Sequence, residues 1–103
     1  MSTITITLRI LQGKKKEFLQ TVRALHEDMK REKGFMKFTI FQEVNDPDVF
    51  HLTEEWNTSD NLEMFTKSET FSVLLGALKV LCKETEIRYQ IGDARKDTKV
   101  LKL

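Results

Sequence analysis

The hydrophobic period of this sequence changes along the chain, and this change constrains the fold more than any single motif does. Residues Thr3 to Leu11 alternate isoleucine or leucine with threonine or arginine, which predicts a strand with one buried face. From Lys14 to Lys33 the apolar residues recur every three or four positions, which predicts an amphipathic helix that Gly34 ends. The chain therefore begins with a strand followed by a helix.

The rest of the chain continues this alternation of elements. Two strands are predicted at 35–44 and 49–56, joined by a turn of Asn, Asp and Pro residues. Two helical segments follow, the first capped by Thr58 or Ser59 and the second by Ser68, before a last strand at 86–91. The order is β-α-β-β-α-β, with the second α unit in two pieces. It predicts an α+β domain of the ferredoxin-like split βαβ type, with a four-stranded antiparallel sheet and helices on one face.

One face of that sheet has no predicted cover. In the second strand, parity places Met36, Phe38 and Ile40 on one face and Phe41 on the other. Phe41, Val49 and Leu11 fall on or near the uncovered face. The simplest cover for apolar groups there is a second copy of the same sheet, so we expect a homodimer through the open sheet face.

The sequence predicts one domain over 1–92 and a separate tail over 93–103. The tail is mostly charged apart from residues such as Val100 and Leu101. We expect it either to be disordered or to pack on the partner subunit.

Composition narrows the partners and the compartment. Seventeen basic and sixteen acidic side chains leave a net charge of +1, which gives no electrostatic reason to expect nucleic acid or an anionic membrane as partner. The single cysteine, Cys82, excludes a disulfide framework within one chain and fits a reducing compartment. The N-terminal stretch lacks the pattern of a signal peptide, and no window reaches the length of a transmembrane helix. A cytoplasmic location is expected.

Several segments between Ile4 and Ile91 resemble the antibiotic biosynthesis monooxygenase superfamily. They are Gly34-Phe35, Phe41-Gln42-Glu43, Asn45-Asp46-Pro47, Glu54-Glu55-Trp56-Asn57-Thr58, Ser68-Glu69-Thr70-Phe71 and Leu74-Leu75. Members of this superfamily are typically dimeric α+β barrels. They include cofactor-independent quinol or anthrone monooxygenases and haem-degrading enzymes, so the resemblance implies a fold more narrowly than an activity.

This sequence departs from its relatives at polar positions. Many quinol-monooxygenase-like members carry a histidine where this chain has Thr70, and the region where haem-degrading members have their axial histidine offers no ligand here. Haem degradation is therefore disfavoured. Anthrone-oxidising members share the tryptophan at Trp56, but they have an asparagine where this chain has Leu52 and a tyrosine near Leu62. This chain thus has the tryptophan of these members but not the polar residues that they have near it.

Cofactor-free oxygenation needs an apolar cavity, a base for a substrate hydroxyl and a donor for the resulting oxyanion. Parity places Leu52, Glu54 and Trp56 on one face of the third strand, and the resemblance implies that this face borders the pocket. Desolvation there would raise the pKa of Glu54 and suit it as the base. A salt bridge from Glu54 to Arg88 or to a lysine is the alternative.

Other candidates have weaker sequence support. His26, at the edge of the first helix's apolar stripe, is either a base or proton shuttle or a histidine bonded to a backbone carbonyl. His51 lies opposite Glu54 by parity and is expected to face the dimer partner. Tyr89 and Arg88 are possible oxyanion donors, of which parity allows only one in the pocket. Trp56 is expected to form a wall of the pocket. Five further residues are expected either to line the pocket or to be ordinary core: Phe38, Leu52, Phe65, Thr70 and Phe71.

The resulting functional hypothesis is a cofactor-independent monooxygenase that oxidises small aromatic or hydroquinone-like substrates with O₂. Glu54 would be its base, His26 its shuttle and Trp56 its wall, with no metal and no cofactor, since His26 and His51 lack ligand spacing. Two alternatives stay open. One is a non-enzymatic small-molecule-binding or stress-response module on the same scaffold, and the other is an isomerase of a small metabolite.

Overall fold

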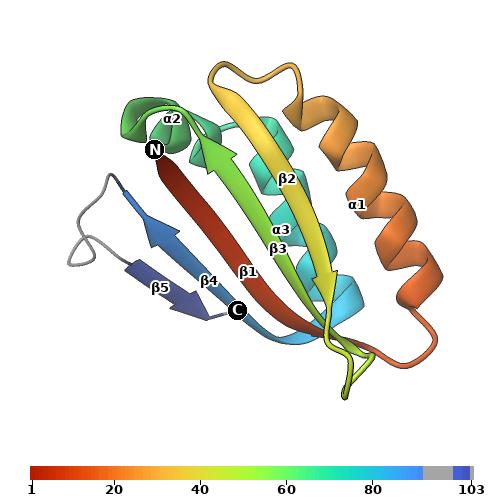
Figure 1. Ribbon diagram of the computed structural model, residues 1–103. Helices are drawn as coiled ribbons and strands as arrows, with labels where there is room; N and C mark the ends of the chain where they lie inside the picture. The colour runs from red at the N-terminus through yellow and green to blue at the C-terminus, as the bar shows by residue number, and fades with distance from the viewer. Residues whose placement is uncertain (92–98, 103) are drawn as a thin grey trace.

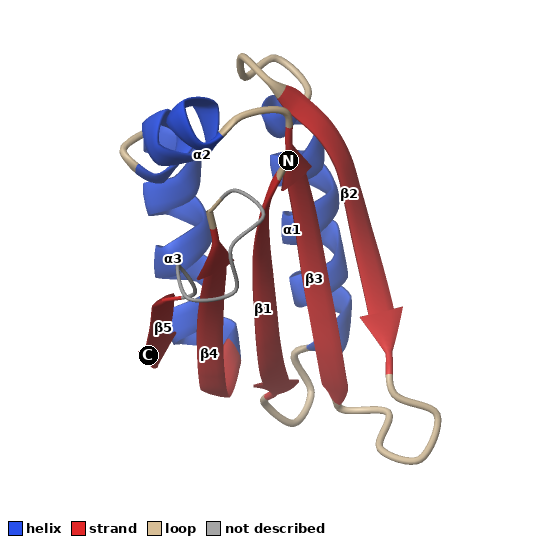
Figure 2. Ribbon diagram, turned by 60° about the vertical axis from the view of Figure 1, so that its left-hand side comes forward, coloured by secondary structure: helices blue, strands red, loops and turns tan. Residues whose placement is uncertain are grey.

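The predicted ferredoxin-like α+β fold is confirmed. The computed structural model describes residues 1–91 and 99–102. The elements, in chain order, are β1 (Ser2–Ile10), α1 (Lys15–Met29), β2 (Phe35–Gln42), β3 (Val49–Trp56), α2 (Ser59–Thr66), α3 (Glu69–Leu81), β4 (Cys82–Gln90) and β5 (Lys99–Lys102). All paired strands are antiparallel, in the order β2-β3-β1-β4-β5. The helices lie together on one side of this sheet, as Figures 1 and 2 show from two directions.

The core lies between the sheet and the helices. Strand β1 supplies every second residue to it, because the side chains of a strand point alternately to its two faces. Ile4, Ile6, Leu8 and Ile10 are all buried. Helix α1 adds a buried stripe, and α3 adds another, at helical spacing: Phe18, Val22, Leu25, Met29, Phe71, Leu74, Leu78 and Leu81.

Helix α1 is shorter than the sequence pattern predicts. It ends at Met29, not at Lys33. The next backbone N–H groups bond only three residues back, with Arg31 N–H donating to the Asp28 carbonyl at 3.2 Å and Glu32 N–H to the Met29 carbonyl at 2.9 Å. Such tight bonds commonly close the last turn of a helix. Gly34, with φ of +86°, then turns the chain into β2.

The predicted inward position of Met36 is wrong. Phe35 pairs with Trp56 and Lys37 with Glu55, so Met36 is an extra residue in β2 at a bulge. The bulge changes the strand parity, so Phe35 contributes to the helix-covered side and Met36 is 55% exposed. Beyond the bulge, the predicted parity holds for Phe38 and for the half-exposed Phe41.

The C-terminal part contains more β-structure than the sequence predicted. Strand β4 begins at Cys82, directly after α3, although the pattern indicated Glu86. An irregularity in its pairing with β1 lies at Glu84, whose φ is +53°. Residues 99–102 form β5, paired with β4 of the same chain. The remaining part of the predicted tail, 93–98 and 103, lies outside the described residues. Among those that are described, no helix combines the length and the apolar character needed to cross a membrane.

Candidate functional site

A carboxyl group is buried near the middle of the helix-covered sheet face. Glu54 on β3 has no solvent-exposed surface, and its cross-strand neighbours are Ile4 on β1 and Phe38 on β2. Leu52 and Trp56, two residues before and after it on the same face, are also completely buried. Strand parity thus brings Leu52, Glu54 and Trp56 together as the sequence predicted.

Neither carboxylate oxygen of Glu54 has a hydrogen-bond partner among the described residues. Burial raises the pKa of Glu54 to about 8, because ionisation would leave an unpaired charge in an apolar environment. The nearby Trp56 side chain acts in the opposite direction and lowers that pKa, although the geometry between the two side chains does not form a hydrogen bond. Arg88, the alternative partner that the sequence offered, instead pairs with Glu86 on the other sheet face at 2.6 Å. Glu54 is therefore mostly a neutral acid at pH 7.

Trp56 is packed on both sides but lacks a hydrogen-bond acceptor. Its ring stacks on Phe65 of α2 with centroids 4.5 Å apart, and it packs edge-to-face with Phe35, with centroids 5.6 Å apart. Among the described residues, its indole Nε1 has no partner. Buried polar groups in native proteins nearly always have a partner, either protein, water or ligand. An unpaired donor and an unpaired acid on adjacent inward positions of one strand are therefore the strongest indication of a binding site here.

The corner between β3 and α2 fixes Trp56 against α2. Thr58 caps the helix by accepting from Asn61 N–H at 3.1 Å, and the Asn61 amide donates to Asn57 Oδ1 at 2.8 Å. Asn57 N–H in turn donates to the carbonyl of Gly34 at 2.9 Å. A side chain at Gly34 would collide with these amides, since a Cβ there would lie 2.4 Å from Asn57 Oδ1 and 2.6 Å from Asn61. Gly34 is thus required both by its φ and by this close contact.

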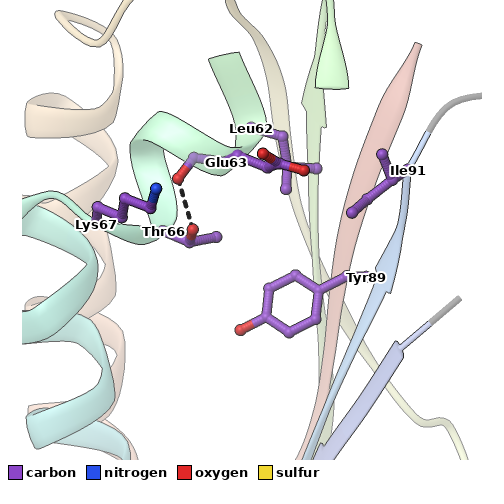
Figure 3. A pocket seen from close by; sticks show the side chains of 6 residues that line it. All are labelled: Leu62, Glu63, Thr66, Lys67, Tyr89 and Ile91. Atoms are coloured by element: carbon purple, nitrogen blue, oxygen red, sulfur yellow. Dashed lines mark hydrogen bonds between the residues drawn. The ribbon is translucent and has the colours of Figure 1, made fainter. Parts of the chain in front are cut away.

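A hollow of about 320 Å³ opens between α2 and the end of β4. Figure 3 shows its lining, which is Leu62, Glu63, Thr66, Lys67, Tyr89 and Ile91. None of the residues predicted as pocket lining, base or shuttle is in this lining. Tyr89, which the sequence offered as a possible oxyanion donor, does line the hollow, and so does Leu62, near which anthrone-oxidising relatives have a tyrosine. Glu63, Thr66 and Lys67 were missed because on an outer helix face such residues look like ordinary solvent-exposed positions.

Tyr89 connects this hollow with the buried acid. It faces the same side of the sheet as Ile4, which lies between it and Glu54 in the strand order. Burial raises the pKa of Tyr89, and the charge of Glu54 raises it further. Tyr89 therefore lines the hollow and lies within electrostatic reach of Glu54, and it is a neutral donor near pH 7.

The other predicted pocket residues are distributed around this centre. Phe65 and Phe71 are buried, with their rings 5.4 Å apart, and Phe71 lies 6.5 Å from the ring of Tyr89. Thr70 lines a different hollow of about 230 Å³, between α1 and α3, together with Leu25, Asp28, Glu69 and Val73. Trp56 is in the lining of neither hollow. The structure thus groups Phe65 and Phe71 with Trp56 but places Thr70 in a separate depression.

His26 lies at the β2 side of the core. Its half-buried ring packs on Phe38 with centroids 5.0 Å apart and on Phe35 at 5.9 Å. Both phenylalanines neighbour the inward face of β3, across from Glu54 and Trp56 respectively. Within the described chain His26 makes no side-chain hydrogen bond. It is near the candidate site, but the structure shows no hydrogen bond or ion pair between His26 and Glu54.

His51 occupies the opposite face of β3, as parity predicted. Its two ring nitrogens have separate partners, Thr7 Oγ1 at 3.0 Å and Glu43 Oε1 at 2.9 Å. These bonds are on the open sheet face, so His51 is a fully bonded side chain of that surface. In the part of the chain that the structure describes, no group of three or more His, Cys, Asp or Glu side chains could hold a metal ion.

The fold is shared with several solved structures. A conserved protein from Methanosarcina mazei is 24% identical with a TM-score of 0.79, over 87% of this chain and 90% of that one. A protein from Nitrosomonas europaea, described as a candidate antibiotic biosynthesis monooxygenase, is 21% identical with a TM-score of 0.76, over 91% and 100%. The cofactor-independent oxygenase SnoaB from Streptomyces nogalater is 16% identical with a TM-score of 0.79, over 93% and 96%. At these identities the likeness concerns the fold alone.

Family membership rests on the sequence itself. No curated protein matches this sequence significantly. The family profile described as "Antibiotic biosynthesis monooxygenase" matches residues 1–74. This range runs from β1 into the first half of α3 and contains both Glu54 and Trp56. Because this match spans well over half of the chain, the protein belongs to the antibiotic biosynthesis monooxygenase family.

Proposed function

We propose that this protein is a cofactor-independent monooxygenase that oxidises small aromatic or hydroquinone-like molecules with O₂. Membership of the family supports the reaction class. One observation carries the proposal for this chain. The Glu54 carboxyl, with a pKa of about 8, and the indole N–H of Trp56 are neighbours on one face of β3, and neither has a hydrogen-bond partner among the described residues. An acid and a donor in an apolar setting are the two groups that such a reaction asks of the protein.

In this mechanism the ionised form of Glu54 accepts the hydroxyl proton of the substrate. The resulting electron-rich anion reduces O₂, and Trp56 Nε1–H stabilises the negative charge on the substrate oxygen. For a hydroquinone, one oxygen atom enters a ring C–H bond and the other leaves as water. The four electrons come from the substrate, which becomes a hydroxyquinone. Because a pKa of about 8 leaves Glu54 mostly protonated at pH 7, the rate should rise with pH up to that value.

Substrate access requires movement of side chains. Glu54 and Trp56 have no exposed surface, whereas the hollow between α2 and β4 is open to solvent. Tyr89 lines this hollow, and the ionised form of Glu54 raises its pKa. We infer that substrate enters from the hollow, past Tyr89 and Leu62, and that motion of α2 side chains admits the reacting ring.

The direct test is oxygen uptake by metal-free protein with a panel of hydroquinones and phenols. Glu54→Gln should lower the rate by roughly 10²-fold or more, the usual contribution of a general base. Glu55→Gln is the matched control, because Glu55 is the next residue on the same strand and faces the other side of the sheet. Absence of uptake across the panel would contradict the proposal.

A non-enzymatic binding module is the second candidate, and the complete burial of Glu54 and Trp56 favours it. In that case the hollow alone would hold the ligand. Ligands would then bind without oxygen consumption, and Glu54→Gln would leave their affinity unchanged. Equilibrium titration beside the oxygen measurement separates the two candidates.

We also propose that two copies associate through the open sheet face. Phe41 is 54% exposed there, and Val49 is half-buried. The same face carries both signs of charge, on Arg9, Lys37, Glu55 and Glu86, which suits a self-complementary contact. Light scattering should give twice the chain mass, and Phe41→Lys should shift it toward the monomer. Val80→Lys, on the outer face of α3, should not.

A cytoplasmic location remains part of the proposal. The single cysteine suits a reducing compartment, and burial raises the pKa of the Cys82 thiol to about 12, which keeps it unreactive. Fractionation of cells that express the protein without added signals tests this location.

A further inference from the structure

The hollow between α2 and β4 carries two charged side chains that do not neutralise each other. Glu63 and Lys67 are four residues apart on α2, a spacing that often allows an ion pair. Within the described part of the chain, neither has an ion-pair partner. Figure 3 shows the Glu63 carboxylate on the side toward Ile91 and the Lys67 ammonium group on the side away from it. Both charges remain available to a ligand.

The rest of the lining suits a flat, largely apolar body. Leu62, Ile91 and the ring of Tyr89 supply apolar surface. The Thr66 hydroxyl donates to the Glu63 backbone carbonyl at 2.6 Å, so its proton is already used. Tyr89 keeps a neutral hydroxyl, because burial and the charge of Glu54 both raise its pKa. A ligand thus meets an apolar slot with one cation, one anion and one neutral donor.

We propose that this hollow selects aromatic monocarboxylates. The ring lies against Leu62 and Tyr89, and Lys67 attracts the carboxylate at the rim. Glu63 repels any second negative charge, which disfavours dicarboxylates. This inference deepens the proposed function, on which it rests for the claim that the ligand is a substrate. It identifies the substrate class as hydroxyaromatic acids with one carboxylate.

The size of the effect follows from exposure. Glu63 and Lys67 are solvent-exposed, so each contributes modestly to affinity and its contribution falls with added salt. Removing Lys67 should weaken monocarboxylate binding roughly threefold, and removing Glu63 should strengthen dicarboxylate binding by roughly twofold. The two substitutions should change affinity in opposite directions although the residues are only one helical turn apart. A general effect of net charge would not be confined to this hollow.

The experiment measures dissociation constants by NMR titration of the full chain at low salt. The probes are 4-hydroxybenzoate, the uncharged 4-hydroxybenzamide and the dianionic 4-hydroxyisophthalate. Lys67→Gln should weaken only the charged probes, Lys67→Arg should restore them, and Glu63→Gln should strengthen the dianion most. Lys79→Gln is the matched control, since it removes the same charge from an exposed position of α3 outside the hollow.

Equal effects of Lys67→Gln and Lys79→Gln would overturn the inference, because they would report only net charge. Ligand-induced shifts away from α2 and β4 would also overturn it. These readouts need no turnover. If the substitutions change binding as predicted but no oxygen is consumed, the carboxylate selectivity is supported and the monooxygenase proposal is contradicted. If oxygen is consumed but binding does not change as predicted, the monooxygenase proposal is supported and the carboxylate selectivity is contradicted.

Discussion

The polar side chains on the two faces of strand β3 differ in their hydrogen bonding. On the open face, His51 bonds to Thr7 and Glu43, and Arg9 of the neighbouring strand binds Asp46 through two hydrogen bonds of 3.2 and 2.8 Å. The Arg9 guanidinium holds the pKa of Asp46 below its usual value. On the helix-covered face, Glu54 has no partner among the described residues.

This difference separates stabilising polar groups from candidate functional ones. A histidine with both nitrogens bonded at half-exposed positions contributes to the surface of the sheet and needs nothing more. A carboxyl group buried without a partner costs folding free energy, and proteins tolerate such a cost mainly where function needs it. Glu54 is therefore a better candidate for a functional group than His51, although histidine is the commoner general base.

The largest expected effect tests the donor on the covered face. Trp56→Phe keeps an aromatic ring against Phe65 but removes the indole N–H. Oxygen uptake should fall by roughly 10²-fold, as it does when a donor to a developing oxyanion is removed. His51→Gln, on the open face, should change the rate by less than about twofold because it does not reach the reacting groups. Similar losses in both variants would remove the distinction between the faces.

The next effect concerns stability against pH. Glu54 is protonated in the folded state up to about pH 8, whereas in the unfolded chain its pKa is near 4.5. The part of the unfolding free energy that depends on this pKa difference is fully present below about pH 4.5 and is lost as pH rises toward 8, by about 1.4 kcal/mol per pH unit. Urea unfolding of the wild type and of Glu54→Gln between pH 5 and 8 measures this loss. Parallel curves for the two proteins would contradict the raised pKa.

A smaller effect tests how the covered face is held in place. Gly34→Ala should destabilise the protein by roughly 2–4 kcal/mol, because the new Cβ meets Asn57 and Asn61 and the positive φ is strained. Gly13→Ala has a similar φ of +79° but no atom within 4 Å of its new Cβ. It should cost only about 1–2 kcal/mol. Equal losses in thermal unfolding would show that φ alone matters.

The smallest effect is expected on the open face. Thr7→Val keeps the β-branched shape but removes the hydroxyl that bonds to His51. The loss of unfolding free energy should be about 1 kcal/mol or less, since the site is partly exposed. Thr5→Val is the matched control. Thr5 lies two residues before Thr7 on the same face of β1 and makes no side-chain hydrogen bond to any described residue, so this substitution should show no loss. A larger cost for Thr7→Val would mean that this network stabilises the fold more than its exposure suggests.

The sequence predicted the fold well because hydrophobic period is a local signal. The alternation in β1 and the spacing in α1 appear directly in the burial of Ile6 and Phe18. The bulge at Met36 and the strand at 99–102 were not predictable in this way. Each depends on how a strand pairs with its neighbour, β2 with β3 and β5 with β4, and hydrophobic period does not encode the register of that pairing.

The candidate site was predictable only in part. Parity placed Glu54 and Trp56 on one face of β3, and the family resemblance implied that this face is the covered one; both side chains are buried there. The hollow was missed because it forms where α2 meets the end of β4, and the residues that line it are separated by more than twenty positions. Only the packed fold reveals that Tyr89 links that hollow to Glu54.

The proposed role of Glu54 as the base depends on its raised pKa. This pKa can be measured by following the side-chain carboxyl carbon of Glu54 in NMR spectra as a function of pH, with Glu54→Gln used to assign the signal. A pKa of about 8 is predicted from the complete burial of an unpartnered carboxyl. A value near 4.5, the ordinary pKa of a glutamate, would show that the carboxyl is solvated or paired and would contradict its proposed role as the base.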